Sequence, residues 1–307
     1  MRVAFADRCD HAVVLVALPT PIPTAVAFWD ARRGLLGTRD CRFAAQCEAG
    51  RIELTADGGR SFRVVLRTRR PVVALQTAGP NAAIARTDGG GALRTLDGGR
   101  SWRPYRLRFT ASFATPLIGL GVRRYAVERH LALAVLATSN GGLTWHRRAS
   151  PCTQAIADSA LVDLVTPWLG WIVCLGQPGA GNQEKAVFRT GDGGRSWRRG
   201  AVEINYPRSL IHGGLSGYGY PEGISFAKDG FGILWESRGT LYVTRDGGKH
   251  WTAEPKVGRP ELDFGRGAAA FTDGRGLVLL GRGGGQPTRL LATNDYGRTW
   301  RLVRRWR

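Results

Sequence analysis

The amino-acid sequence predicts an all-β fold, a β-propeller built from four-stranded antiparallel blades. A pattern of Thr-x-Asp-x-Gly-x-Ser/Thr-aromatic recurs six times along the 307 residues. Its acidic position falls at residues 57, 97, 140, 192, 246 and 295, so the copies lie 40 to 54 residues apart. This is the period of propeller blades. Glycine supplies 43 residues, about twice its average share, which favours many tight turns over helices.

Each copy of the pattern has the composition of a tight hairpin turn. The copies read TADGGRSF from Thr55, TLDGGRSW from Thr95, TSNGGLTW from Thr138, TGDGGRSW from Thr190, TRDGGKHW from Thr244 and TNDYGRTW from Thr293. The acidic side chain can accept hydrogen bonds from the backbone N–H groups of its own turn. Glycine supplies the positive φ that the turn needs. The aromatic residue begins the returning strand and packs under the hairpin.

We therefore assign the polar and aromatic positions of the pattern a structural role. The polar positions are Asp57, Asp97, Asn140, Asp192, Asp246 and Asp295, and the tryptophans are Trp102, Trp145, Trp197, Trp251 and Trp300. Five aspartates in one chain could suggest catalytic carboxylates. Their place in the turn already accounts for them, and we expect this turn to join the third and fourth strands of each blade.

These turns resemble the Asp-box (BNR) repeats of sialidases, sortilin-type receptors, xyloglucanase-type glycosidases and the photosystem II assembly factor family. The resemblance covers about residues 25–307 and implies a β-propeller. It does not imply one function, because the same repeat occurs in enzymes and in binding scaffolds.

The blades can be followed in order along the chain. They begin near Ala25, Val72, Ala111, Ala160, Gly223 and Ala268. Blade five is the clearest, with short apolar runs at residues 223–227, 231–236, 240–244 and 250–253 separated by tight turns. Six blades are favoured and seven remain the alternative. Residues 25–307 form a single domain, and residues 1–24 form an N-terminal extension, either a strand that latches the ring or an export remnant.

The charge and hydropathy of the chain indicate which classes of binding partner are expected. No run of 18 apolar residues occurs, so we expect no membrane span. The net charge is +20, and forty of the 44 basic residues are arginine. Such a surface could attract a polyanion, for example an anionic envelope polymer. The alternative is a compositional bias that spreads arginine evenly. Nucleic acid is disfavoured, because five of the ten tryptophans belong to the repeated turns and are expected to be buried rather than free to stack on bases.

Cysteine spacing suggests two disulfides and no metal. The sequence contains no Cys-x-x-Cys, and its five histidines are scattered, so neither a metal site nor a cofactor is predicted. Cys41 and Cys47 could close one loop, and Cys152 and Cys174 reach the same face of the propeller, which leaves Cys9 unpaired. Disulfides would place the chain outside the cytoplasm, although the N-terminus does not resemble a signal peptide.

The best candidate site lies on the face opposite the repeated turns, over blades four and five, where the long loops gather. Its members are Asn182, Gln183, Glu184, Lys185, His212, Tyr218, Tyr220 and Glu222. Aromatic, amide and carboxylate groups together suit sugar or peptide recognition. The alternative is that Glu184 and Lys185 form a solvated pair and that the tyrosines only pin a glycine-rich loop.

The function predicted from these features is a non-catalytic, monomeric binding or assembly scaffold for a protein or an envelope glycan. The alternative is a sialidase-like exo-glycosidase. Such an enzyme would need a Tyr–Glu nucleophile pair, drawn from Tyr218 or Tyr220 with Glu222 or Glu236. Nothing in the sequence fixes the geometry of that pair, so the binding function is favoured.

Overall fold

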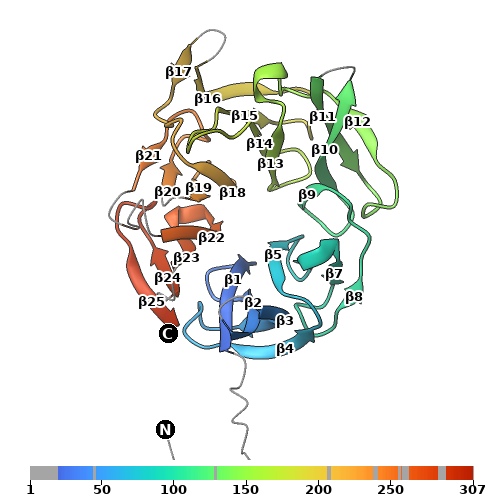
Figure 1. The fold of residues 1–307 in the computed structure, drawn as a ribbon, viewed down its shortest axis with the longest axis vertical. Helices are drawn as coiled ribbons and strands as arrows, with labels where there is room; N and C mark the ends of the chain where they lie inside the picture. Colours follow the sequence, from blue (N-terminus) through green and yellow to red (C-terminus); the bar gives the residue numbers. More distant parts are fainter. Residues whose placement is uncertain are drawn as a thin grey trace, which may run out of the picture.

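The computed structural model describes residues 20–43, 46–127, 130–205, 209–237, 241–254, 257, 263–282 and 288–306. Within these residues, six antiparallel sheets stand around a central axis like the blades of a propeller (Figure 1). The prediction of an all-β propeller with six blades is confirmed. In the described part of the chain no helix is long and apolar enough to cross a membrane.

Each blade is formed by strands that follow one another in the chain, from the central axis outwards. Blade one holds β1 (Thr20–Phe28), β2 (Gly34–Phe43), β3 (Gln46–Thr55) and β4 (Arg63–Thr68); blade two holds β5 (Val72–Thr77), β6 (Ala83–Thr87), β7 (Ala92–Thr95) and β8 (Arg103–Pro104); blade three holds β9 (Thr110–Phe113), β10 (Gly119–Val127), β11 (His130–Thr138) and β12 (His146–Arg148). Blade four holds β13 (Ser159–Leu164), β14 (Gly170–Leu175), β15 (Lys185–Thr190), β16 (Arg198–Ile204) and β17 (Leu210–His212); blade five holds β18 (Tyr220–Phe226), β19 (Gly232–Ser237), β20 (Leu241–Thr244) and β21 (Thr252–Ala253); blade six holds β22 (Asp263–Ala270), β23 (Gly276–Arg282), β24 (Thr288–Thr293) and β25 (Arg301–Trp306).

Two features of this arrangement were not anticipated from the sequence. Blade four has a fifth strand, β17, which pairs antiparallel with the outer strand β16. Strand β1 begins at Thr20, so the expected domain boundary at residue 25 falls inside a strand. The rest of the expected N-terminal extension, residues 1–19, and Cys9 with it, lie outside the described residues.

The six repeated turns, called box turns here, share one network of hydrogen bonds. In blade four, the Thr190 hydroxyl donates to Asp192 Oδ1 (2.8 Å) and accepts from the Gly194 backbone N–H (2.9 Å). The other carboxylate oxygen of Asp192 accepts from the Ser196 hydroxyl (2.6 Å).

In blade three, Asn140 replaces the aspartate. Its Oδ1 accepts from the Thr138 hydroxyl and from the Thr144 backbone N–H, whereas its Nδ2 donates to the Thr144 hydroxyl. The turn therefore keeps its shape with an amide in place of the carboxylate, although one hydrogen bond is reversed in direction.

The second glycine of a box turn also packs against the preceding blade. A Cβ atom on Gly194, whose φ is +84°, would lie 3.1 Å from Leu120 of blade three. A Cβ atom on Gly59 of blade one would lie 2.3 Å from Leu290 of blade six, across the point where the ring closes. Each box turn thus closes its own hairpin and also packs against the preceding blade.

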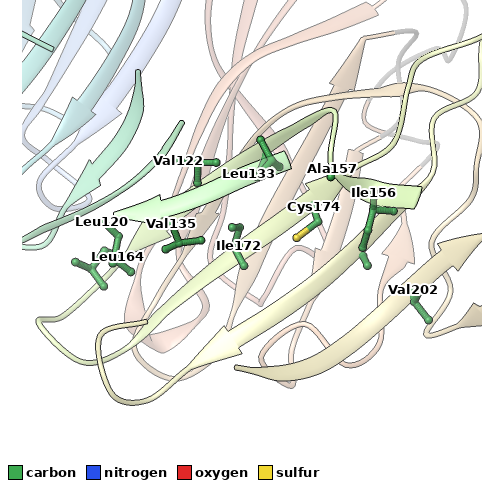
Figure 2. Packing of buried hydrophobic residues seen from close by; sticks show 12 residues of the cluster. Leu120, Val122, Leu133, Val135, Ile156, Ala157, Leu164, Ile172, Cys174 and Val202 are labelled. Atoms are coloured by element: carbon green, nitrogen blue, oxygen red, sulfur yellow. The ribbon is translucent and has the colours of Figure 1, made fainter. Parts of the chain in front are cut away.

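The apolar core lies between adjacent blades rather than inside one. Figure 2 shows the cluster between blades three and four, where Leu120 and Val135 meet Leu164 and Ile172. A similar cluster joins blade six to blade one and closes the ring. Because every blade buries both of its faces against neighbours, the strands read as short apolar runs.

Side chains on the innermost strands tie successive blades together around the axis. The Ser112 hydroxyl of blade three accepts from the Leu164 backbone N–H of blade four (3.0 Å). Asp163 of blade four accepts from the Phe226 N–H of blade five (2.7 Å), and Ser225 accepts from the Ala270 N–H of blade six (3.0 Å).

Both predicted disulfides are present. Cys41 bonds to Cys47 across β2 and β3, and Cys152 in the connection to blade four bonds to Cys174 on β14. The second bond fastens the segment between blades three and four to the buried face of β14.

The box-turn network predicts a pH-dependent difference between two substitutions at Asp192. Hydrogen bonds from the side chain and backbone of Ser196 hold the pKa of this exposed carboxyl well below its usual range. Such a group stabilises the fold above about pH 4, and this contribution is lost as the pH falls through its lowered pKa. We expect Asp192→Ala to lower Tm at pH 7 clearly and Asp192→Asn only slightly, because Asn140 already serves in blade three. The advantage of the wild type over the Asn variant should shrink as the pH falls below about 4. Thermal melts that rank the two variants equally at pH 7 would contradict this account of the turn.

Candidate functional site

Two loops meet on the face opposite the box turns, and we call residues 176–184 and 216–219 together the loop pair. The first loop joins β14 to β15. The second ends the connection from β17 to β18, whose first residues, Gly213 and Gly214, still lie against the blade five box turn. The Gln183 backbone N–H donates to Gly217 O (2.8 Å), and the Gly219 N–H donates to Gly181 O (2.8 Å). Asn182 and Tyr218 face each other as a bridge between the loops. The loops therefore pair in the manner of two short strands.

A buried ion pair lies directly beneath the loop pair. Lys185 Nζ is 2.5 Å from Glu236 Oε1, and both side chains are fully buried. The same ammonium group also reaches the carbonyl oxygens of Tyr218 (3.4 Å) and Gly219 (3.5 Å). Lys185 thus joins blade four, blade five and the second loop at one point.

The surroundings of this pair are polar and buried. Glu203 and Tyr242 complete the cluster, and the Tyr242 hydroxyl accepts from the Ser216 backbone N–H (3.3 Å). Desolvation raises the pKa of Glu236 to about 7 against the opposing effect of Lys185, and burial lowers the pKa of Lys185. Burial also raises the pKa of Tyr242 to about 12.

The fit of the second loop over this cluster depends on Gly219. A Cβ atom on Gly219, which has a φ of +88°, would meet Glu236 Oε2 at 2.4 Å. That oxygen is buried and has no hydrogen-bond partner within the described residues. The second loop therefore lies directly on the carboxylate and closes the cluster from solvent.

The structure brings most of the expected site residues together and gives them different roles. Asn182, Tyr218 and Glu222 are exposed. Gln183 is buried, with its amide donating to Gly176 O (2.8 Å). The alternative in which Glu184 and Lys185 form a solvated pair is wrong, because Lys185 is buried against Glu236 instead.

The remaining expected members are supports or lie elsewhere. Glu184 accepts from the Asn205 backbone N–H (2.8 Å), and the Tyr220 hydroxyl accepts from the Gly181 N–H (2.8 Å). His212 is exposed on β17, where its ring packs edge-on against His250 of the blade five box turn, with 5.5 Å between ring centroids. It therefore lies toward the box turns and away from the loop pair.

A cavity of about 870 Å³ runs along the centre of the ring and is lined by the innermost strands of all six blades. Glu222 lies at an irregularity in β18 and lines this cavity. Asp163 also lines the cavity, and desolvation raises its pKa to about 6. Arg266 of blade six lines it too, and burial together with the charge of Arg39 lowers the pKa of Arg266.

Sequence reasoning missed the positions whose role depends on distant contacts. Glu236 was considered only as a nucleophile, and Glu203 and Asp163 were not singled out. No local signal marks them, since each resembles an ordinary strand residue. In the described ranges no group of three or more His, Cys, Asp or Glu side chains is placed to hold a metal ion.

Comparison with known proteins places the chain by fold alone. No family model and no curated protein matches it. Among solved structures it is similar to the fucose-recognising lectin of Aleuria aurantia, a six-bladed β-propeller, at 13% identity and a TM-score of 0.58 over 92% of this chain and 94% of the lectin. It is also similar to a protein of unknown function from Dyadobacter fermentans, at 14% identity and a TM-score of 0.51 over 90% and 94% of the two chains. YCF48 from Cyanidioschyzon merolae matches at 17% identity and a TM-score of 0.47 over 94% and 86% of the two chains.

The buried ion pair predicts a large loss of stability when one partner is removed. Lys185→Met leaves Glu236 without its counter-charge in a buried site, which should cost about 3–5 kcal/mol of unfolding free energy. The double variant Lys185→Met/Glu236→Leu removes both charges and should recover most of that loss. Urea unfolding of the three proteins checks this. A single variant as stable as the wild type would mean that the ion pair does not support the loop pair.

The raised pKa of Asp163 predicts that replacing this residue with asparagine stabilises the fold. Its pKa of about 6 lies above that of an ordinary aspartate, so the folded state is weakened as the pH rises from about 4 to 6 and stays weakened above that range. Asp163→Asn retains an acceptor for the Phe226 N–H and removes the charge. We expect the variant to have a higher Tm than the wild type at pH 8. Its unfolding free energy should be larger by at most about 3 kcal/mol. The difference should vanish below about pH 4. A lower Tm at pH 8 would show that the charge itself is needed.

Proposed function

We propose that this chain is a non-catalytic Asp-box propeller that acts as a binding scaffold, recognising a protein or an envelope glycan through the loop pair. The ligand contacts are assigned to the exposed side chains of Asn182 and Tyr218, with Glu222 at the neighbouring cavity wall. Gln183, Glu184, Lys185 and Tyr220 hold the loops in place.

The observation that carries this proposal is the buried Lys185–Glu236 ion pair under the loop pair. Burying two charges is costly, and a hydrophobic pair of similar size is often at least as stable. The ion pair and its polar neighbours fix one conformation of two long, glycine-rich segments. A loop that is ordered before it meets its ligand loses less conformational entropy on binding. Function in rigid scaffolds is usually carried by loops of this kind.

The exposed groups of the loop pair suit a polar ligand with apolar faces. Tyr218 keeps 40% of its surface exposed, although large aromatic side chains are usually buried. The ring can pack on a sugar or on a peptide side chain, and the Asn182 amide can donate and accept hydrogen bonds beside it. The Aleuria aurantia lectin is an example of sugar recognition on a six-bladed propeller, and its likeness to this chain is one of fold.

The hydrolase alternative receives less support from the same geometry. A Tyr–Glu nucleophile pair built on Glu236 would need that carboxylate to reach substrate. Glu236 is 1% exposed, bonded to Lys185 and covered by Gly219. The two disulfides support a further part of the proposal, that the protein works in an oxidising, extracytoplasmic compartment.

Substitution of the exposed pair tests the proposed function. We expect Asn182→Ala/Tyr218→Ala to weaken binding at least tenfold on a glycan array and on an array of envelope-protein peptides, without lowering Tm. Trp168→Ala is the matched control, because Trp168 is another exposed aromatic residue and lies away from the loop pair.

Two results would contradict the proposal. One is a ligand whose binding survives the double substitution and is lost with Trp168→Ala. The other is turnover of a panel of fluorogenic glycosides by the wild type, which would establish an enzyme instead of a scaffold.

A further inference from the structure

The box turns carry a second repeated feature, a basic residue three positions after the acidic one. It is arginine in blades one, two, four and six and lysine in blade five, at Arg60, Arg100, Arg195, Arg298 and Lys249. All five side chains are exposed. Because every box turn joins the third strand of its blade to the fourth, these cations stand at the same end of every blade that carries one.

Three of these arginines are held in the same way by a neutral group. The Nη1 atom of Arg60 donates to the Asp57 backbone carbonyl (2.9 Å). Arg195 donates to Asp192 O (2.8 Å) and Arg298 to Asp295 O (3.1 Å). The guanidinium group is therefore anchored at one nitrogen, and its other donors remain exposed.

In the part of the chain that the structure describes, the box-turn carboxylates form no ion pair with these five cations. In blade four both oxygens of Asp192 are occupied by hydrogen bonds from its own turn, and the other box turns repeat this pattern. Within the described residues, no ion pair involves any of the five box-turn cations. The N–H donors of these five cations are thus left without a carboxylate partner in the described part of the chain.

A second row of arginines begins where the outer strands leave the box turns. Arg63, Arg103, Arg198 and Arg301 each follow the aromatic residue of a box turn, and all four are exposed. Four blades therefore present two arginines each at the same end of the ring. Arginine binds phosphate in a bidentate fork, which lysine cannot do.

We propose that the box-turn arginines form a docking surface for a linear, phosphate-bearing polymer outside the cytoplasm. The cations repeat once per blade, so a chain that follows the ring can meet several of them in succession, and each contact raises the effective concentration of the next. A flexible polymer fits this arrangement better than a rigid one because the row curves with the ring. The disulfides favour an extracytoplasmic polymer over a cytosolic one. This surface is independent of the loop pair and of the function proposed for it.

The test compares two triple variants that remove the same number of charges. Arg60→Gln/Arg195→Gln/Arg298→Gln changes the anchored arginines of the box turns. Arg69→Gln/Arg108→Gln/Arg123→Gln changes three exposed arginines outside the box turns and serves as the control. Fluorescence anisotropy with labelled long-chain inorganic polyphosphate, measured over a series of salt concentrations, gives the affinity. Circular dichroism melts verify that both variants fold.

We expect the box-turn variant to lose at least tenfold in affinity at physiological salt and the control variant less than threefold. The slope of log K against log salt should fall by about 2 in the box-turn variant, since each lost contact with a single-stranded polyanion contributes about 0.7. Tripolyphosphate, which is too short to span blades, should bind at least a hundredfold more weakly than the long chain. Asn182→Ala/Tyr218→Ala should leave polyphosphate binding unchanged.

Three outcomes would overturn the proposal. Equal losses in the two triple variants would mean that net charge alone attracts the polymer. Equal affinity for tripolyphosphate would exclude contacts across several blades. Tighter binding to duplex DNA or to anionic lipid vesicles than to polyphosphate, at the same salt, would assign the surface to a different class of partner.

Discussion

The structure depends on the hydrogen-bonded closure of the box turn. A threonine hydroxyl and a carboxylate together satisfy the backbone N–H groups of the hairpin, so the turn needs no help from solvent. The second glycine then brings the turn against the preceding blade, as Gly194 does at Leu120 and Gly59 does at Leu290. The residues that close each hairpin therefore also hold it against the preceding blade, and this is repeated around the ring. This is why a pattern of eight residues specifies the arrangement of six blades.

The regularity of the box turns leaves the opposite face free to vary. There, the chain that follows β16 folds back as β17. The second loop comes after β17 and pairs with the first loop. Such long segments have no repeated motif to order them, and the buried Lys185–Glu236 pair supplies that order. The ion pair costs desolvation energy that a leucine pair would not. The ion pair lies directly beneath the two loops and contacts the second one through the carbonyl oxygens of Tyr218 and Gly219.

The sequence predicted the propeller, the six box turns and both disulfides because each is encoded locally or by period. It failed where a role depends on residues far apart. Lys185 and Glu236 are separated by 51 positions, and neither shows a motif. Beside Glu184, Lys185 resembled half of a solvated pair, although it is buried against Glu236 of the next blade. His212 was grouped with the loops because it is near them in sequence, and β17 instead carries it toward His250.

The chemistry of the box turn also explains the charge of its face. Among the described residues, a carboxylate whose oxygens are occupied by its own turn forms no ion pair with the neighbouring arginine, so the guanidinium donors of that arginine stay exposed. Repetition of the turn repeats this exposed guanidinium in four of the six blades. The loop pair has the opposite character, with one lysine that is buried and paired and with exposed amide and aromatic groups. The two faces differ because the repeated box turns form one of them, whereas loops that do not follow the repeat form the other. The two faces therefore offer different contacts, exposed arginines on one and exposed amide and aromatic groups on the other.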